Sequence, residues 1–363
     1  MMAGKTGAAG GPILLIGGSG VVGGHIARLL GKLPGAEIVL AGRNAARVNR
    51  AARTLRHEGV RAEARISADV PQNVALTAMA CIRHRASYID VANSRAQAVA
   101  FAGLHEAAVA AGVLAVTGAC VLPCVSMAAV MAISVDLQAV SAIRIYLCSG
   151  NQEPSGAAAM RVALRSAGRR FVTRRNGRDA AAHGWQSLES LDLPGVAPDS
   201  GRVQRLFATI DSAEHDVAVA RWPDIADVQV RSGFELGLLQ RALCLAAWAP
   251  RLRLLPSLAW ATGIGVDLAR LCSHFGSARS VLRVEVEGIA GNHAVRRLWQ
   301  LEGDDGDLAW IAAAPAAALA RLLLVGPPPP PGAGVAAGMP GLREIVAELR
   351  HRNIRVRTLD LDR

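Results

Sequence analysis

Short apolar runs alternate with amphipathic stretches through residues 12–141. The apolar or alternating runs predict strands at residues 13–16, 37–41, 60–66, 88–91 and 113–117. Stretches with helical periodicity lie between them, at residues 25–33, 44–57, 71–85 and 94–111. A further helix is expected to begin near Pro123, because proline suits the first turn of a helix. Strands that alternate with helices predict a doubly wound parallel sheet, and so an α/β domain.

The pattern changes after residue 141. Residues 142–147 predict a strand, and residues 171–175 predict a hairpin that turns near Gly177. A second hairpin is expected from residues 282–287 and 295–301, which flank a Gly-Asn pair. These antiparallel features predict a second domain of the α+β class.

Residues 234–271 are rich in leucine, alanine and tryptophan. They contain four arginines and no acidic residue between Glu235 and Asp267, and Pro250 and Pro256 divide them into short helices. We consider three interpretations: a buried helical hairpin, a dimer interface, or a patch on a membrane surface. The first two are favoured, because helices at a membrane surface usually have a cleaner polar face.

These patterns divide the chain into five parts. The last begins with the proline run of residues 327–331, a stiff linker, and continues into a tail whose residues 342–361 predict a helix and a short strand docking on the first domain. The expected parts are a flexible lead (1–11), a nucleotide-binding domain (12–141), a substrate and dimerisation domain (142–309), a helix returning to the first domain (310–326), and the linker with the tail (327–363).

Composition narrows the class of protein. A chain of 363 residues suggests two domains, and 52% hydrophobic against 19% charged residues indicates a globular protein. The net charge of +11 comes from scattered arginines, and only 4% of residues are aromatic, so a nucleic-acid partner is not expected. The six cysteines have no metal-ligand spacing, so we expect reduced, buried thiols and no metal.

The cellular location is expected to be the cytoplasm. Residues 1–11 are small and glycine-rich and lack the apolar core of a signal peptide. No uncharged apolar run reaches the roughly 18 residues that a membrane-spanning helix needs.

A glycine-rich turn follows the first predicted strand and opens the first predicted helix. Its spacing, Gly18-x-Gly20-x-x-Gly23, is that of a dinucleotide-binding turn. Gly18 permits the tight turn, Gly20 lets a pyrophosphate approach the backbone, and Gly23 lets the helix pack on the strand. Free backbone N–H groups of Ser19, Val21 and Val22 would face the phosphates. The sequence therefore predicts a Rossmann-type domain.

The end of the second predicted strand indicates which dinucleotide binds. Proteins that prefer NAD usually carry an acidic residue there, but this chain has Gly42-Arg43-Asn44. A small residue followed by arginine leaves room for a 2′-phosphate and supplies a planar charged donor for it. We therefore predict NADP(H) as the cofactor, with Arg43 and Asn44 in its binding site.

Candidate catalytic residues lie at the end of another predicted strand. Tyr88 and Asp90 stand where a doubly wound sheet places its ligands, although a core tyrosine and a loop-capping aspartate explain them equally well. His183 and Trp185 are candidates to line the substrate cleft from the second domain. Neither tyrosine of the chain has a lysine four residues later, which argues against a short-chain dehydrogenase.

Several segments together resemble the saccharopine dehydrogenase (saccharopine reductase)-like oxidoreductases. They are the glycine turn, residues 41–44, 80–90 and 116–119, and, less specifically, residues 149–151, 183–186 and 310–316. The resemblance covers residues 12–325. It implies an NADP-dependent Rossmann domain joined to an antiparallel α/β domain, with the substrate held between them. Relatives reduce imines formed between an amine and a carbonyl compound.

The chain departs from the family's pattern between Asp69 and Tyr88. The family has a helix, a strand and a second helix there, whereas this interval has room for one helix, so about one strand-helix unit of roughly twenty residues is absent. Residues 68–72 are the candidate remnant, with Asp69 at the cofactor. If the absent strand is the central one, the sheet has a gap; if residues 60–66 move inward, the loss falls at an edge.

We therefore expect an NADP(H)-dependent oxidoreductase that reduces an imine or carbonyl substrate and forms a homodimer. Two alternatives remain. One is an NADP-binding protein without turnover, since the absent unit borders the nicotinamide pocket. The other is a peripheral membrane reductase that acts on lipid substrates and contacts the bilayer through residues 234–271.

Overall fold

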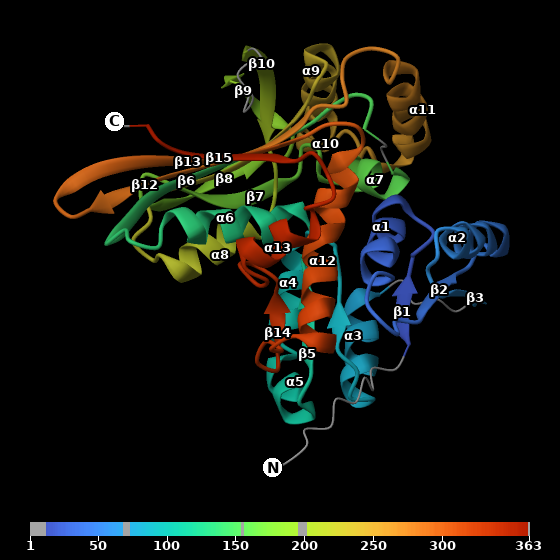
Figure 1. The fold of residues 1–363 in the computed structure, drawn as a ribbon. Helices are drawn as coiled ribbons and strands as arrows, with labels where there is room; N and C mark the ends of the chain where they lie inside the picture. The colour runs from blue at the N-terminus through green and yellow to red at the C-terminus, as the bar shows by residue number, and fades with distance from the viewer. Residues whose placement is uncertain (1–11, 68–72, 154–155, 195–201, 362–363) are drawn as a thin grey trace.

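Two parallel half-sheets and one large mixed sheet organise the chain (Figure 1). The computed structural model describes residues 12–67, 73–153, 156–194 and 202–361. Helices cover the half-sheets, and the large sheet lies across their upper end. The expected α/β class, with a parallel domain followed by a domain built on a largely antiparallel sheet, is confirmed.

The first half-sheet has the order β1-β2-β3 and is parallel throughout. Its helices α1 and α2 follow β1 and β2, and they bury Leu29 and Leu55 against Leu40 of the sheet. Asn44 caps α2, because its side-chain Oδ1 accepts a hydrogen bond from the Arg47 backbone N–H at 3.0 Å. The elements are β1 (Ile13–Ile16), α1 (Val21–Leu30), β2 (Ile38–Gly42), α2 (Ala45–His57) and β3 (Ala62–Ile66).

The second half-sheet has the order β14-β5-β4 and is also parallel. The helix predicted over residues 94–111 is two helices, because Gly103 ends the first and Leu104 begins the second. Residues 332–335, predicted as part of the tail, form strand β14 beside β5. The elements are α3 (Val74–Arg83), β4 (Tyr88–Ile89), α4 (Arg95–Ala102), α5 (His105–Ala111), β5 (Leu114–Thr117) and β14 (Gly332–Val335).

A gap separates the two half-sheets. Within the described residues β1 pairs only with β2, and β4 pairs only with β5. Strand β3 stays on the outer side of β2, so it has not moved inward, and in the described ranges no strand occupies the central position on the other side of β1. Leu14 and Ile16 share one face of β1 and are 55% and 44% exposed, so the described helices leave that face partly uncovered. Asp69 lies outside the described residues.

The large sheet of the second domain has the order β15-β13-β12-β6-β11-β10-β9. Strands β11 and β6 pair in parallel and the other neighbours are antiparallel. Both predicted hairpins are confirmed, as β7 with β8 and as β12 with β13. The strands are β6 (Ala139–Ser149), β7 (Arg170–Arg175), β8 (Arg178–His183), β9 (Gln186–Pro194), β10 (Arg202–Thr209), β11 (Asp227–Phe234), β12 (Ser280–Ala290), β13 (His293–Gly303) and β15 (Arg355–Asp360).

The tail does not end on the first domain. Its helix α13 (Leu342–Glu348) packs on α12 and α6, and its strand β15 pairs with β13 of the second domain. The prediction that the tail docks on the first domain is therefore wrong for its strand, which pairs with the second domain. The edge of β13 offers a free row of backbone groups, and Arg297 of that strand adds an ion pair to Asp360 at 3.4 Å.

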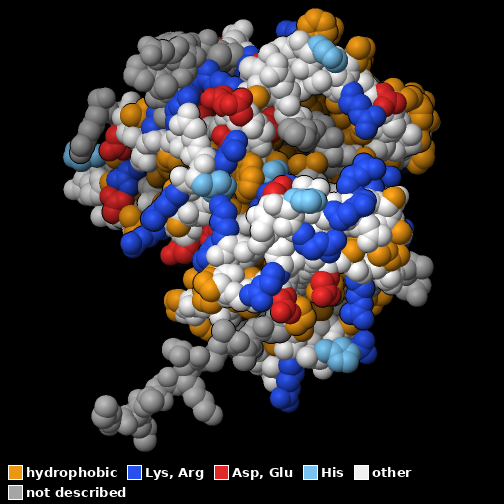
Figure 2. Space-filling model, turned by 45° about the vertical axis from the view of Figure 1, so that its right-hand side comes forward, with side chains coloured by type: hydrophobic (Ala, Val, Ile, Leu, Met, Phe, Trp, Pro, Cys, Tyr) orange, Lys and Arg blue, Asp and Glu red, His pale blue; other side chains and the backbone are white. Residues whose placement is uncertain are grey.

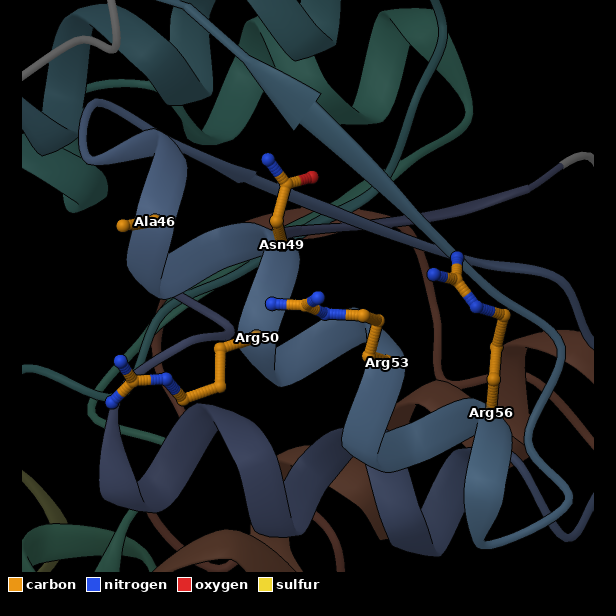
Figure 3. A pocket seen from close by; sticks show the side chains of 5 residues that line it. All are labelled: Ala46, Asn49, Arg50, Arg53 and Arg56. Atoms are coloured by element: carbon orange, nitrogen blue, oxygen red, sulfur yellow. The ribbon is translucent and has the colours of Figure 1, made fainter.

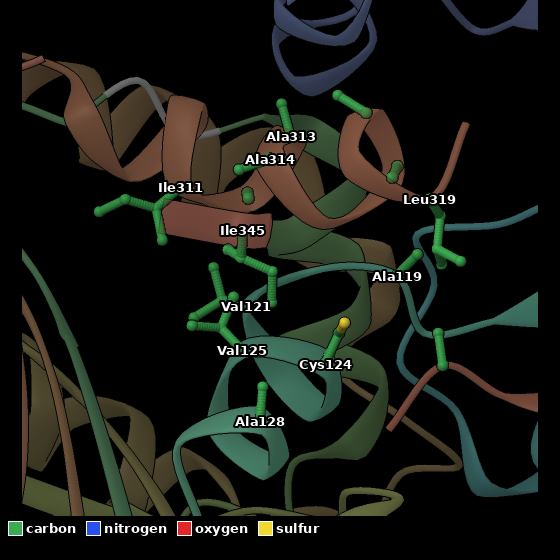
Figure 4. Close-up of a cluster of buried hydrophobic side chains, with 14 of the residues drawn as sticks. Ala119, Val121, Cys124, Val125, Ala128, Ile311, Ala313, Ala314, Leu319 and Ile345 are labelled. Carbon is green, nitrogen blue, oxygen red and sulfur yellow. The ribbon is translucent and has the colours of Figure 1, made fainter. Parts of the chain in front are cut away.

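Helix α12 (Asp307–Val325) joins the domains. It packs on α1 and on a π-helical turn (Val121–Val125) that leads into α6 (Ser126–Ile133). Figure 4 shows its alanines and Ile311 facing Val121, Val125 and Ile345. Among the described residues, α12 is long and apolar enough to cross a membrane, but more than half of it is buried in this core.

Residues 234–271 fold into short helices, as predicted, but they are not a buried hairpin. Leu238, Leu245 and Trp260 are 76%, 73% and 70% exposed. The interpretation as a buried helical hairpin is therefore wrong within this single chain. Only the inner face of the segment packs against other residues of the chain. Its elements are α9 (Gly237–Ala246), α10 (Trp248–Arg251), a 3₁₀ turn (Ala259–Ala261) and α11 (Thr262–Cys272).

Polar contacts also hold the two domains together. The Arg95 guanidinium Nε donates to Asp216 at 2.7 Å, and its Nη1 donates to Asp211 at 3.2 Å. Glu214 of α8 (Glu214–Arg221) is fully buried and accepts from the hydroxyls of Ser126 and Ser212. Burial raises the pKa of Glu214, and the hydrogen bonds from the two hydroxyls oppose that shift.

The neighbouring His215 is expected to make the stability of the protein depend on pH. Burial, with a smaller contribution from Arg95, lowers its pKa to about 4 from the ordinary 6.5, while the Ile210 carbonyl and Asp216 oppose the shift. Because the native state resists protonation here, stability is lost as the pH falls from 6.5 to 4, by up to about 3 kcal/mol. Urea unfolding at both pH values should show a smaller loss for His215→Asn than for the wild type.

The exposed His57 on α2 supplies the control for this experiment. His57→Asn should lose as much stability between the two pH values as the wild type does. Equal losses in all three proteins would contradict the assignment to His215.

Candidate functional site

The glycine turn between β1 and α1 has the geometry that its sequence predicts. Gly17 has φ +78°, in the left-handed region that favours glycine. A Cβ on Gly18 would lie 2.5 Å from Leu40 Cδ2, and a Cβ on Gly23 would lie 2.7 Å from the Gly17 carbonyl oxygen. The chain therefore needs glycine at both positions for α1 to start this close to β1 and β2.

The start of α1 presents unused backbone donors. Gly20 is its N-cap and has no side-chain cap, and the first helical hydrogen bond runs from Gly24 N–H to the Gly20 carbonyl. The amides of Val21, Val22 and Gly23 precede that bond and have no helical partner. Amides at a helix N-terminus bind anions. We call the glycine turn with these three amides the phosphate cradle, because its shape and donors suit the pyrophosphate of a dinucleotide.

Arginines stand beside the turn. Arg43 follows β2, is exposed, and has no ion pair within the described parts of the chain. Arg47 lies one helical turn further along, and its Nη2 is 3.5 Å from the Ser19 carbonyl oxygen within the glycine turn. Arg43 was predicted from the sequence and Arg47 was not, although its place in the first turn of the helix that follows β2 was an available signal. Asn44 serves as the cap of α2.

More arginines continue along α2. Ala46, Asn49, Arg50, Arg53 and Arg56 line an open groove of about 370 Å³ (Figure 3). Figure 3 shows the three guanidinium groups spaced along the helix. Arg56 is engaged, because its Nη1 donates to the Ala62 carbonyl at 2.9 Å. The exposed surface of α2, beside the predicted binding site for the ribose phosphate, is thus strongly basic.

Tyr88 and Asp90 lie together at the carboxyl end of β4. Tyr88 packs beside Phe101, with ring centres 6.0 Å apart, and Asp90 Oδ1 accepts from the Ala92 N–H at 2.6 Å. Burial raises the pKa of both side chains, and for Tyr88 the Asp90 charge adds to the effect. A tyrosine in this state keeps its proton at neutral pH and can donate it.

The cysteine pair after β5 borders this position. Burial raises the pKa of Cys120 to about 11, and it raises that of Cys124 further. Both are therefore thiols at neutral pH, which is the inert form. Cys124 packs in the core of Figure 4, and no cluster of metal-ligating side chains occurs in the described ranges.

The two candidates from the second domain differ in their surroundings. His183 ends β8, is half-buried, and has its pKa lowered by burial and by Arg251 and Arg170. Trp185 is only 6% exposed, stacks on Phe234 with ring centres 5.4 Å apart, and donates its indole N–H to Ser166 at 3.0 Å. Trp185 is therefore a core residue rather than a wall of an open cleft.

The glycine turn and the end of β4 lie on the same side of the first domain. The arrowheads of β1 and β5 in Figure 1 point toward the second domain, so the glycine turn and the end of β4 both face it. In doubly wound sheets ligands bind at this carboxyl edge. Fold and site together define a two-domain α/β protein whose first domain carries a Rossmann-type glycine turn.

Comparison with solved structures agrees with this class. Apo saccharopine dehydrogenase (L-Glu forming) from Saccharomyces cerevisiae matches with a TM-score of 0.66 and 10% identity, over 96% of this chain and 100% of that one. The chain thus has the fold of that enzyme. No protein-family model and no curated protein sequence matches.

Two further matches have lower TM-scores. The C. glutamicum DAP dehydrogenase in complex with DAP has a TM-score of 0.43 at 15% identity, over 94% of this chain and 98% of that one. Biliverdin reductase from Synechocystis sp. PCC 6803, in complex with biliverdin and NADP+, has 0.38 at 11%, over 93% and 95%. Neither carries an argument about this chain.

Two neighbouring glycines of α1 test the close approach at the turn. Gly23→Ala should destabilise the protein by about 1–3 kcal/mol, since the new Cβ meets backbone atoms. Gly24→Ala is the matched control: its Cβ would meet the Arg28 side chain at 3.4 Å and the Gly18 carbonyl oxygen at 3.8 Å, both ordinary contacts, and alanine gains up to about 1 kcal/mol of helix propensity. Urea unfolding distinguishes the two, and a Gly23→Ala protein as stable as the control would contradict the geometry.

Proposed function

We propose that this chain is an NADP(H)-dependent oxidoreductase that reduces an imine or carbonyl group of a small molecule held between its two domains. The observation that carries the proposal is the combination of the glycine turn and two arginines, Arg43 and Arg47, at one strand edge. The imine class rests on the resemblance to saccharopine dehydrogenase-like proteins in sequence motifs and fold. A cytoplasmic homodimer is part of the same proposal.

The residues present fit the phosphate end of the cofactor. The cradle left by the glycines would hold the pyrophosphate against the amides of residues 21–23. Arg43 and Arg47 would bind the 2′-phosphate, for which a planar guanidinium can donate two parallel hydrogen bonds. No acidic side chain occupies the position after β2 where the ribose hydroxyls of NAD are usually bound.

At the other end, Tyr88 and Asp90 would manage the proton. NADPH, when bound, supplies the hydride for the substrate carbon. The nitrogen or oxygen of the reduced group needs a proton, and the Tyr88 hydroxyl is a donor that stays protonated at neutral pH. The charge of Asp90 would act on that hydroxyl, and Asp90 is itself fixed by the Ala92 N–H.

Arginine variants test the cofactor. Arg43→Ala and Arg47→Ala should each raise the Kd for NADPH by about 10–100-fold, because each removes a charge-assisted contact. The Kd for NADH should stay unchanged. Fluorescence titration with both nucleotides measures this, with Arg61→Ala, an exposed arginine at the amino end of β3, as the control that keeps NADPH affinity. An unmodified protein that ignores NADPH or prefers NADH contradicts the proposal.

A variant at the strand end tests the chemistry. Tyr88→Phe should lower kcat for NADPH oxidation by about 10²–10⁴-fold and leave the NADPH Kd unchanged, since only the proton donor is lost. The assay follows NADPH absorbance across a panel of imines and ketones. Tyr146→Phe, a buried tyrosine of the second domain, is the control and should keep full activity. Equal activity of Tyr88→Phe and wild type would remove Tyr88 from the mechanism.

One observation favours a second function, NADP binding without turnover. The gap beside β1 removes the strand that would lie under the nicotinamide, whereas the phosphate cradle is complete. This alternative predicts tight NADPH binding with no oxidation over the whole substrate panel.

A further inference from the structure

We propose that residues 237–275, together with the neighbouring helix α7 (Ala157–Ser166), form a docking surface for an anionic membrane. We call this part of the molecule the helical lobe. The inference is independent of the proposed reductase activity, because it concerns a surface and not the nucleotide site. It selects one of the three interpretations that the sequence left open.

The first observation is an unusually apolar surface. Figure 2 shows hydrophobic side chains gathered at the upper right, where α9 and α11 lie in Figure 1. Contiguous patches of this kind on a soluble chain indicate a partner or a membrane. The exposed large side chains of the lobe are Leu238, Leu245, Trp248, Leu252, Leu254, Leu255, Trp260, Ile264, Leu268, Leu271 and Phe275.

The second observation is that these side chains belong to a packed unit. The inner face of the lobe forms its own core, with Leu258 and Ala247 buried against Leu164 and Trp185. Helix α11 lies so close to α7 that a Cβ on Gly265 would be 2.9 Å from the Met160 sulfur. The exposed leucines and tryptophans are therefore a distinct outer face, and tightening the lobe would not bury them.

The third observation is the charge of the lobe. Its only acidic residue is Asp267, which is paired with Arg270 at 3.2 Å. Arg241 and Arg253 are exposed among the leucines, and α7 adds exposed Arg161 and Arg165. Anionic headgroups satisfy such arginines, while the leucines enter the boundary of the acyl chains.

The tryptophans agree with a bilayer boundary. Trp260 is 70% exposed, and Trp248 is held in place by the Arg251 guanidinium, which lies 4.3 Å from the centre of its ring. Amphipathic indole rings concentrate at the level of the lipid headgroups. Arg251 also donates to the Gln186 side chain, so it fixes the Trp248 ring at the surface, where lipid headgroups would contact the indole.

A second copy of the chain is the less suitable occupant. In a two-fold interface the same patch meets itself, so the lobe's arginines would face arginines. The lobe offers no unpaired carboxylate to offset that repulsion. Because the lobe has so few acidic residues, an anionic membrane is a better partner for it than a second copy of the same lobe.

The test uses the full-length protein and vesicles of equal parts phosphatidylcholine and phosphatidylserine. We expect the protein to co-sediment with them, to bind vesicles of phosphatidylcholine alone at least about ten-fold more weakly, and to dissociate as salt rises. The variant Leu254→Ser/Trp260→Ser should lower the bound fraction at least about ten-fold, since it removes apolar anchors. Val99→Ser, at an equally exposed valine on α4, is the matched control and should bind as wild type.

Two results would overturn the proposal. One is a protein that stays in solution with anionic vesicles and forms a dimer that Leu254→Ser/Trp260→Ser disrupts, which would assign the lobe to an interface between copies. The other is vesicle binding that the variant and the control lower equally. Circular dichroism of both variants verifies that they are folded, so that loss of binding reflects the surface.

Discussion

Packing of α12 against the first domain is the interaction on which the rest of this structure depends. Among the residues that the structure describes, no hydrogen-bonded ladder joins the two half-sheets, and one continuous core connects them instead. That core contains Leu40 of one half-sheet, Val116 of the other and Val284 of the second domain, with Ala313 and Ala317 of α12 among them. The small side chains let the helix approach closely, so dispersion and burial replace the missing backbone pairing.

The same constraint divides the candidate site into two parts. The phosphate cradle depends on β1, α1 and β2, which pair and pack within one half-sheet and so are unaffected by the gap. Tyr88 and Asp90 belong to the other half-sheet, and their position relative to the cradle is set by α12 and by the contacts of Arg95 and Glu214 with the second domain. The proposed nucleotide binding would thus be a local property, whereas the proposed hydride transfer would depend on how the domains are held.

Much of the fold could be predicted, because its signals are local. The glycine spacing, the end of β2 and the Gly-Asn turn of the β12–β13 hairpin each specify a backbone path over a few residues. Strand β14 could not be predicted in this way, since Gly332–Val335 has no strand pattern and pairs only because β5 offers an edge. The pairing of β15 with β13 and the contact of Arg47 with the glycine turn likewise join residues that are distant in sequence.

The sequence by itself determined the class of fold, the dinucleotide turn and the basic residue after β2, because side-chain size and backbone freedom decide these within one turn of chain. The tertiary structure decided which strand is absent, where the tail docks, and that the leucines of the helical lobe face outward. Those outcomes depend on which surfaces compete for burial once all elements are present. Helical periodicity shows that a face is apolar, and only the assembled structure shows whether a partner covers it.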